Sequence, residues 1–102
     1  MIKENIYRTH SCGELNIGDV GKKVRVSGWV ENIRDHGGII FIDLRDQYGM
    51  VQLVSDDENF FEGVSKKMTI KVKGEVVART QEMINPKIGT GEIEISASEK
   101  EI

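Results

Sequence analysis

The most constraining feature of the sequence is an alternation at residues 39–46. One parity is aliphatic and consists of Ile40, Ile42 and Leu44. The other parity consists of Phe41, Asp43 and Arg45. Alternation with a period of two predicts a strand that is buried on its aliphatic face and open on the other. Phe41 then stands on the face that otherwise carries an acid and a base, where polar residues are expected. A flat aromatic ring on that face indicates a platform for a flat ligand.

Two further strands flank this segment and complete a meander with short connections. Residues 22–34 form the first strand, in which Gly28 predicts a bulge or a sharp bend. Because a bulge inverts the parity, the sequence leaves open which face Arg34 occupies. The third strand covers residues 50–54 and turns Gln52 outward. We therefore expect Gln52 to lie beside the aromatic residue of the central strand.

The second half of the chain predicts one helix and two more strands. Ser55 and Glu58 have the spacing of a capping box, which indicates a helix that begins at Ser55. The apolar stripe of this helix is Phe60, Phe61, Val64 and Met68. A fourth strand is expected at residues 68–79, followed by a loop at 80–91 and a fifth strand at 92–97.

These elements predict an all-β fold with one domain at residues 1–102. Five short strands with glycine at the bends are typical of a closed or nearly closed barrel. The five-stranded OB-fold, with one helix between its third and fourth strands, matches this order best. OB-folds bind oligonucleotides on the face of strands 2 and 3. That is the face on which we expect Phe41 and Gln52.

The bulk properties restrict the class of protein. A chain of 102 residues with 30% charged and 38% hydrophobic residues is expected to form one globular domain with one core. The formal net charge of −3 argues against indiscriminate binding of nucleic acid through bulk positive charge. The single cysteine, Cys12, cannot form an internal disulfide. With no membrane-spanning run or signal peptide in the sequence, we expect a cytoplasmic protein.

No catalytic or metal site is expected in this chain. The sequence lacks a Ser-His-Asp order, a phosphate loop and a metal-ligand spacing. Asp43 and Asp46 are interpreted as the polar surface of a strand, and the acidic residues 56–58 as helix capping. We therefore predict no catalytic residue, no metal and no cofactor for this domain.

Several residues are candidates for binding. Phe41 has the strongest case, because an aromatic ring can stack on a base, although loops of the protein could equally cover it. The amide of Gln52 can read a base edge, and the guanidinium groups of Arg34, Arg45 and Arg79 can hold phosphates or bases. Glu94 can accept a hydrogen bond from the amine of cytosine. Taken alone, each of these polar residues is also compatible with plain surface, as is His36 in the turn beside Phe41.

Longer motifs resemble a known family. The sequence carries Arg8-Thr9-His10-Ser11-Cys12-Gly13-Glu14-Leu15, Gly28-Trp29-Val30, Arg34-Asp35-His36-Gly37-Gly38, Phe41-Ile42-Asp43-Leu44-Arg45-Asp46 and Gly49-Met50-Val51-Gln52. These blocks, continued through Gly74, Arg79 and Gly91-Glu92-Ile93-Glu94, closely resemble the N-terminal anticodon-binding domain of bacterial-type aspartyl-tRNA synthetases. The central strand motif is shared with asparaginyl and lysyl relatives. The opening Arg-Thr-His-x-Cys-Gly block favours the aspartyl type.

The resemblance implies an OB-fold that splays a tRNA anticodon loop over its first three strands. It implies that Phe41 stacks on the middle base, a uridine, with Gln52 hydrogen-bonded near it. Glu94 would accept from the amine of the third base, a cytosine. Arg34 and Arg79 would contact the anticodon stem-loop. These assignments name the base, which periodicity alone does not.

The resemblance also implies a partner and a parent protein. His36 stands where many discriminating members have leucine, which implies that asparagine tRNA is accepted in addition to aspartate tRNA. Some members have a basic residue at the position of Val77, and some have asparagine in the loop at residues 80–86. This sequence departs from both patterns, so the resemblance implies no RNA contact at these two places. The parent enzyme would attach aspartate to its tRNA, use ATP and Mg²⁺ in a class II catalytic domain absent from this chain, and form a homodimer. This domain alone is expected to be a monomer that binds RNA and catalyses nothing.

Two other functions remain open at this point. A general single-strand-binding OB module would bind RNAs of equal length alike, with strong salt dependence. A protein-interaction domain would use Phe41 to contact a polypeptide. The anticodon-binding domain of an asparaginyl or lysyl relative is a third, closely related alternative.

Overall fold

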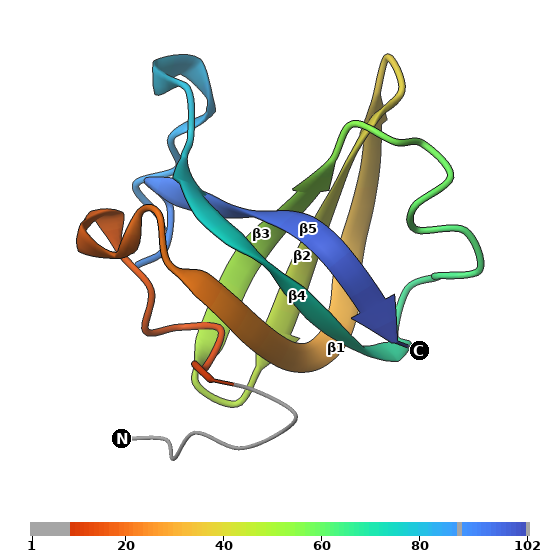
Figure 1. Ribbon diagram of the computed structural model, residues 1–102, viewed down its shortest axis with the longest axis horizontal. Helices are drawn as coiled ribbons and strands as arrows, with labels where there is room; N and C mark the ends of the chain where they lie inside the picture. The colour runs from red at the N-terminus through yellow and green to blue at the C-terminus, as the bar shows by residue number, and fades with distance from the viewer. Residues whose placement is uncertain (1–8, 88, 102) are drawn as a thin grey trace.

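The computed structural model describes residues 9–87 and 89–101 and shows a closed barrel of five strands (Figure 1). The elements in chain order are η1 (Ile17–Asp19), β1 (Lys23–His36), β2 (Ile39–Asp46), β3 (Gly49–Ser55), β4 (Thr69–Ala78), η2 (Gln81–Met83) and β5 (Ile93–Glu101). Around the barrel the order is β1-β2-β3-β5-β4. The pairs are antiparallel except β3 with β5, which is parallel. The predicted five-stranded OB-fold is confirmed.

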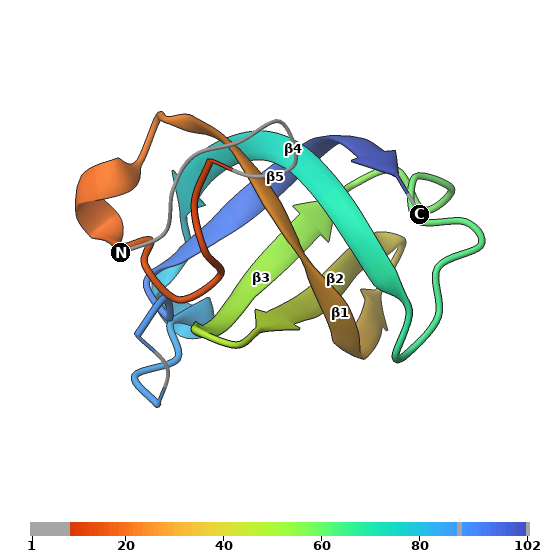
Figure 2. The same ribbon diagram turned by 90° about the horizontal axis from the view of Figure 1, so that it is seen from below.

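Strand β1 closes the barrel by changing partners along its length. Lys23–Trp29 pairs with β4, and Trp29–His36 pairs with β2. Figure 2 shows β1 and β4 crossing over β2 and β3, the crossing that closes the sheet on itself. Gly28 lies where β2 and β4 converge, and a side chain there would collide with the carbonyl oxygen of Arg45. The expected bulge lies instead between Val30 and Asn32.

The barrel interior is filled by one aliphatic core. Strand β2 contributes Ile42 and Leu44, both fully buried, as its alternation predicted. The other strands contribute buried residues of one parity each, among them Val24, Val26, Val30, Val51, Leu53, Ile70, Val72, Val76, Ile93 and Ile95. Full burial of each large aliphatic side chain contributes about 1.5–3 kcal/mol to folding, so the core is the main source of stability.

The predicted helix between the third and fourth strands is absent. Residues 56–68 form consecutive turns, closed by bonds such as Phe60 N–H to Asp57 O and Val64 N–H to Phe61 O. The Ser55 hydroxyl accepts from the backbone of Asp57 two residues on, so it stabilises a turn rather than a helix N-terminus. The positive φ of Gly63 then breaks any helical run.

The apolar stripe predicted for that helix nevertheless reaches the core. Phe61 is buried, and Phe60, Val64 and Met68 pack against the core from the turns. Figure 1 shows this segment as the green loop that runs between β3 and β4. The spacing of the apolar residues therefore identified the buried side chains, while the helical backbone was wrong.

Two acidic residues of β2 differ from their predicted place on the open surface. Asp43 and Asp46 are each only 7% exposed. Asp46 accepts hydrogen bonds from the backbone N–H groups of Cys12, Tyr48 and Gly49, which ties the segment before β1 to the β2–β3 turn. Asp43 belongs to the polar network described below. In the described part of the chain, no helix has the length and hydropathy of a membrane span.

Candidate nucleic-acid interface

Phe41 forms part of the floor of a groove on the outer face of β2 and β3. The groove has a volume of about 400 Å³. It is lined by Ile39, Phe41, Val54, Ser55, Asp56, Val77, Thr80, Met83, Glu94, Ser96 and Ala97. The Phe41 side chain is only 9% exposed, so the expectation of an open aromatic platform is wrong. A flat ligand that reaches this ring must enter between the groove walls.

Two segments far apart in the sequence lie beside the Phe41 ring or line its groove. The β1–β2 turn brings His36 edge-on to the Phe41 ring, with ring centroids 5.5 Å apart and an interplanar angle of 88°. On the other side, η2 brings Met83 to the groove. Figure 1 shows the β1–β2 turn and the η2 segment projecting from the same end of the barrel. The placement of His36 beside Phe41 agrees with the sequence-based expectation.

A continuous chain of polar side chains lies next to this floor. Arg34 donates from Nη1 to Asp43 Oδ2 at 2.6 Å and from Nη2 to Asp43 Oδ1 at 3.2 Å. The same Nη2 donates to Gln52 Oε1 at 2.7 Å. Gln52 Nε2 then donates to Glu94 Oε1 at 2.8 Å. Three strands, β1, β2 and β3, are thus linked to β5 by side chains on one face.

This chain of contacts changes the description of Gln52 and Arg34. Gln52 points outward from the barrel core, as predicted, but it is only 2% exposed because its polar neighbours cover it. Arg34 lies on the same face, directly opposite Phe41 on β1, which resolves the parity that the bulge had left open. Its guanidinium is held by Asp43 in a forked pair, so much of its hydrogen-bonding capacity is already used.

Arg79 follows β4 and fixes the far wall of the groove. Its Nε donates to Ile93 O at 2.8 Å, and its Nη1 donates to Met83 O at 3.1 Å, which attaches η2 to β5. Its Nη2 is buried and has no hydrogen-bond partner among the described residues. Burial lowers the pKa of the Arg79 guanidinium, and the nearby carboxylates of Glu94 and Asp43 oppose that shift. The group stays a cation with one donor end still to be satisfied.

Of the six predicted site residues, Phe41 and Glu94 line the groove, and the other four lie next to it. The six are Arg34, His36, Phe41, Gln52, Arg79 and Glu94, connected by the contacts given above. The sequence missed Asp43, although it lies two residues from Phe41 on the same parity. It also missed the apolar wall formed by Val54 and Met83. The part of the chain that the structure describes holds no group of three or more His, Cys, Asp or Glu side chains arranged to bind a metal ion.

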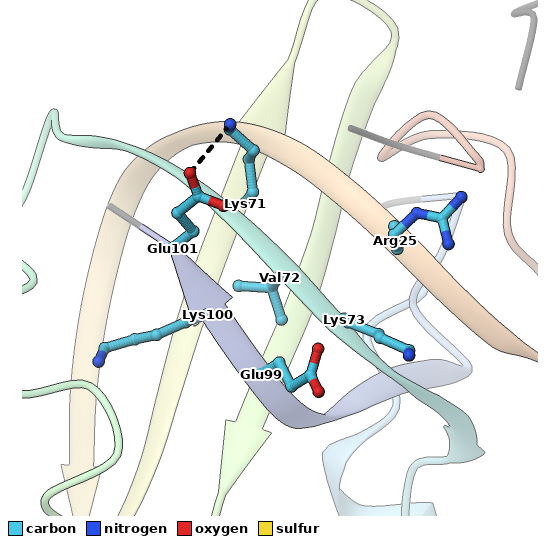
Figure 3. Close-up of a pocket in the computed structure, with 7 residues that line it drawn as sticks. All are labelled: Arg25, Lys71, Val72, Lys73, Glu99, Lys100 and Glu101. Atoms are coloured by element: carbon cyan, nitrogen blue, oxygen red, sulfur yellow. Dashed lines mark hydrogen bonds and ion pairs between the residues drawn. The ribbon is translucent and has the colours of Figure 1, made fainter. Parts of the chain in front are cut away.

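A second hollow, of about 290 Å³, lies over β1, β4 and β5 (Figure 3). It is lined by Arg25, Lys71, Val72, Lys73, Glu99, Lys100 and Glu101. The Lys71 ammonium and the Glu101 carboxylate form an ion pair of 3.4 Å across its upper end in Figure 3. None of its lining residues is aromatic, so it offers no surface on which a base can stack. The groove around Phe41 is the better nucleic-acid interface.

Comparison with known proteins gives the family. A family model described as an OB-fold nucleic acid binding domain, of the tRNA anticodon type, matches residues 24–102. The aspartate–tRNA(Asp/Asn) ligase of Phenylobacterium zucineum is 51% identical over 96% of this chain and 17% of its own length. The aspartate–tRNA ligase of Streptomyces avermitilis is 52% identical over 94% of this chain and 17% of its own length. The chain thus spans about a sixth of the curated relatives that it matches.

Solved structures agree with this assignment. The asparaginyl-tRNA synthetase of Pyrococcus horikoshii superposes with a TM-score of 0.72 and 26% identity, over 99% of this chain and 22% of that one. An OBody bound to hen egg-white lysozyme superposes with a TM-score of 0.77 and 26% identity, over 100% of this chain and 96% of that one. Because the family model covers most of the barrel, this chain belongs to the OB-fold nucleic acid binding domains of the tRNA anticodon type, and its sequence relatives include aspartate–tRNA ligases.

Proposed function

We propose that this chain recognises the anticodon loop of aspartate tRNA for an aspartate–tRNA ligase. The observation that carries the proposal is the groove that combines the Phe41 ring with the carboxylate of Glu94. A base stacked on an aromatic ring gains about 1–3 kcal/mol whatever its identity. A carboxylate beside it adds selection, because it accepts from a base amine and repels phosphate. The groove therefore suits a splayed, single-stranded base better than a duplex.

Each predicted residue has a place in this proposal. Phe41 stacks on the middle anticodon base, and Gln52 hydrogen-bonds near that base. Glu94 accepts from the amine of the third base, for which its Oε2 has no hydrogen-bond partner in the described residues. Arg34 offers the exposed part of its guanidinium to the stem-loop. Arg79 contacts the stem-loop through its unpaired Nη2 only if RNA binding uncovers that atom, which is buried in the free chain.

The relatives support a proposal about the partner and the parent protein. We propose that the domain serves a class II ligase that attaches aspartate to tRNA with ATP and Mg²⁺ in a separate catalytic domain, as a cytoplasmic homodimer. His36 stands at the edge of the Phe41 ring, and a ring N–H there can donate to a uridine carbonyl. We therefore propose that asparagine tRNA, whose third anticodon base is uridine, is bound as well. Several relatives carry the name aspartate–tRNA(Asp/Asn) ligase.

Glu94→Ala should remove recognition of the third-base amine. The test compares two aspartate stem-loops, one with cytosine at the third anticodon position and one with zebularine, which lacks only the 4-amino group. Wild type should bind the cytosine loop more tightly by about 1–3 kcal/mol, the worth of a good base-edge contact. In the variant the two loops should bind equally, as measured by fluorescence anisotropy.

Glu92→Ala is the matched control, because Glu92 is an exposed acid just before β5 and lies outside the groove. It removes the same charge, so it should leave the cytosine preference intact. Equal binding of the two loops by wild type would contradict the role of Glu94, and so would a preference that survives in Glu94→Ala.

A further inference from the structure

The hydrogen bonds beside the groove have a direction that the chemistry of their ends determines. Arg34 has only donors, and the Glu94 carboxylate has only acceptors. Gln52 lies between them, with Oε1 2.7 Å from Arg34 Nη2 and Nε2 2.8 Å from Glu94 Oε1. The amide orientation of Gln52, which is often ambiguous, is therefore fixed by its two neighbours. This orientation holds Glu94 by one oxygen and leaves the other available.

Asp43 is the first member of this series of hydrogen-bonded side chains, and it does not line the groove. It is buried, and both of its carboxylate oxygens accept from Arg34. Asn32 Nδ2 adds a weaker contact at 3.4 Å. The forked pair anchors the Arg34 guanidinium over β2, at the β1 side of Gln52. Asp43 is thus the group that determines where the Arg34 cation rests.

The charges around the groove indicate what the Arg34–Asp43 pair prevents. Two cations, Arg34 and Arg79, share the site with two carboxylates, Asp43 and Glu94. Without the Asp43 charge, Glu94 would be the remaining carboxylate for both cations. A guanidinium binds a carboxylate in a forked geometry and occupies both oxygens. Arg34 would then displace Gln52 and cover the acceptor that a base amine needs.

We propose that Asp43 is a positioning residue for base selection: it holds Arg34 away from Glu94, so that the Glu94 carboxylate stays open to a base amine. The inference rests on the proposed anticodon-binding function and deepens it. The proposal predicts opposite effects on two quantities, the preference for one base and the overall affinity for RNA. Loss of the Asp43 charge makes the site more positive, which favours any RNA, while it closes the acceptor that discriminates between bases.

Asp43→Asn tests this prediction with the cytosine and zebularine stem-loops. The preference for cytosine should fall by about fivefold or more, the range that a base-edge contact provides. Affinity for the zebularine loop should be unchanged or higher, and its salt dependence steeper, because the local charge has risen by one. Asp46→Asn is the matched control: the residue is equally buried on the same strand, but it holds backbone N–H groups at the β2–β3 turn. That control should lower thermal stability and leave the cytosine preference intact.

A second variant identifies Arg34 as the cause. In Arg34→Met/Asp43→Asn no cation can move to Glu94 from β1, so part of the cytosine preference should return. Asp43→Asn should also shift the side-chain amide signals of Gln52 in NMR spectra of the free chain, since Arg34 no longer holds its oxygen. Retained preference and unchanged Gln52 signals in Asp43→Asn would overturn the inference. If wild type itself shows no cytosine preference, the proposed function fails, whereas the Gln52 signals still report on the anchor.

Discussion

Replacing Phe41 with alanine should weaken binding of the aspartate anticodon stem-loop by about 1–3 kcal/mol, the worth of one stacked base. The ring forms part of the groove floor and is held by its edge contact with His36. Removing the ring takes away the surface on which a base stacks but leaves the barrel core, which lies on the opposite face of β2. Affinity is measured by titration and folding by circular dichroism.

Because Phe41 is mostly covered, alanine also removes buried apolar area and some stability. Phe41→Leu addresses this effect, since leucine fills much of the space but offers no aromatic face. It should lose nearly as much affinity as the alanine variant while unfolding closer to wild type. Phe60→Ala is the matched control, because Phe60 packs on the core from the turns after β3, outside the groove. Full affinity in a folded Phe41→Leu protein would rule out stacking on this ring.

Replacing Gly28 with alanine should destabilise the barrel by roughly 3 kcal/mol, the upper end of the usual cost of overpacking. A β-carbon at this position would lie far inside van der Waals contact with the Arg45 carbonyl oxygen, and also close to the Leu44 side chain. The obstacle is backbone in the β2 ladder, which cannot move aside as a side chain could. Thermal and urea unfolding measure the loss.

Gly89→Ala is the control for this substitution. Nothing lies within 4 Å of a β-carbon built at Gly89, so alanine there should change the free energy of unfolding by less than about 0.5 kcal/mol. A Gly28→Ala variant as stable as wild type would contradict the close approach of β1 and β2 at this point.

The strands were predictable because their signal is local. Residues 39–46 were predicted as a strand, and β2 has those bounds, with the aliphatic parity inward. A half-buried strand in which one face is aliphatic determines its own register, since a slip by one residue would expose the whole set. The fifth strand was predicted too short, because its end, residues 98–101, is polar, although residues 99–101 pair with β4.

The helix failed for a reason equally local. Ser55 and Glu58 fit a capping box by spacing, but the same serine can bond to the backbone of a turn. Asp57 does likewise, accepting from the backbone of Asn59. Residues that stabilise turns in this way compete with helix formation. Gly63, which has a positive φ, also interrupts a helical backbone.

The burial of the site residues could not be predicted from the periodicity of the sequence. Phe41 lines its groove together with Met83 of η2, some forty residues later in the sequence, and Asp43 is paired with Arg34 from β1. The link between Gln52 and Glu94 depends on the parallel pairing of β3 with β5, a contact that no local pattern encodes. Periodicity therefore identified the face, whereas tertiary contacts determined that the face is a groove with a preorganised polar wall.

The most direct test of anticodon recognition is a titration of the 102-residue chain with four RNAs. These are the aspartate, asparagine and lysine anticodon stem-loops and an unstructured strand of equal length. The aspartate loop should bind most tightly. The asparagine and lysine loops, which have uridine in place of cytosine at the third anticodon position, should bind more weakly. The unstructured strand should be weaker than the aspartate loop by about tenfold or more, a difference of about 1.4 kcal/mol that one base-edge contact can supply. Equal affinity for all four RNAs, with steep salt dependence, would indicate a general single-strand binder. No binding of any of them would contradict RNA recognition altogether and favour a polypeptide partner for the groove.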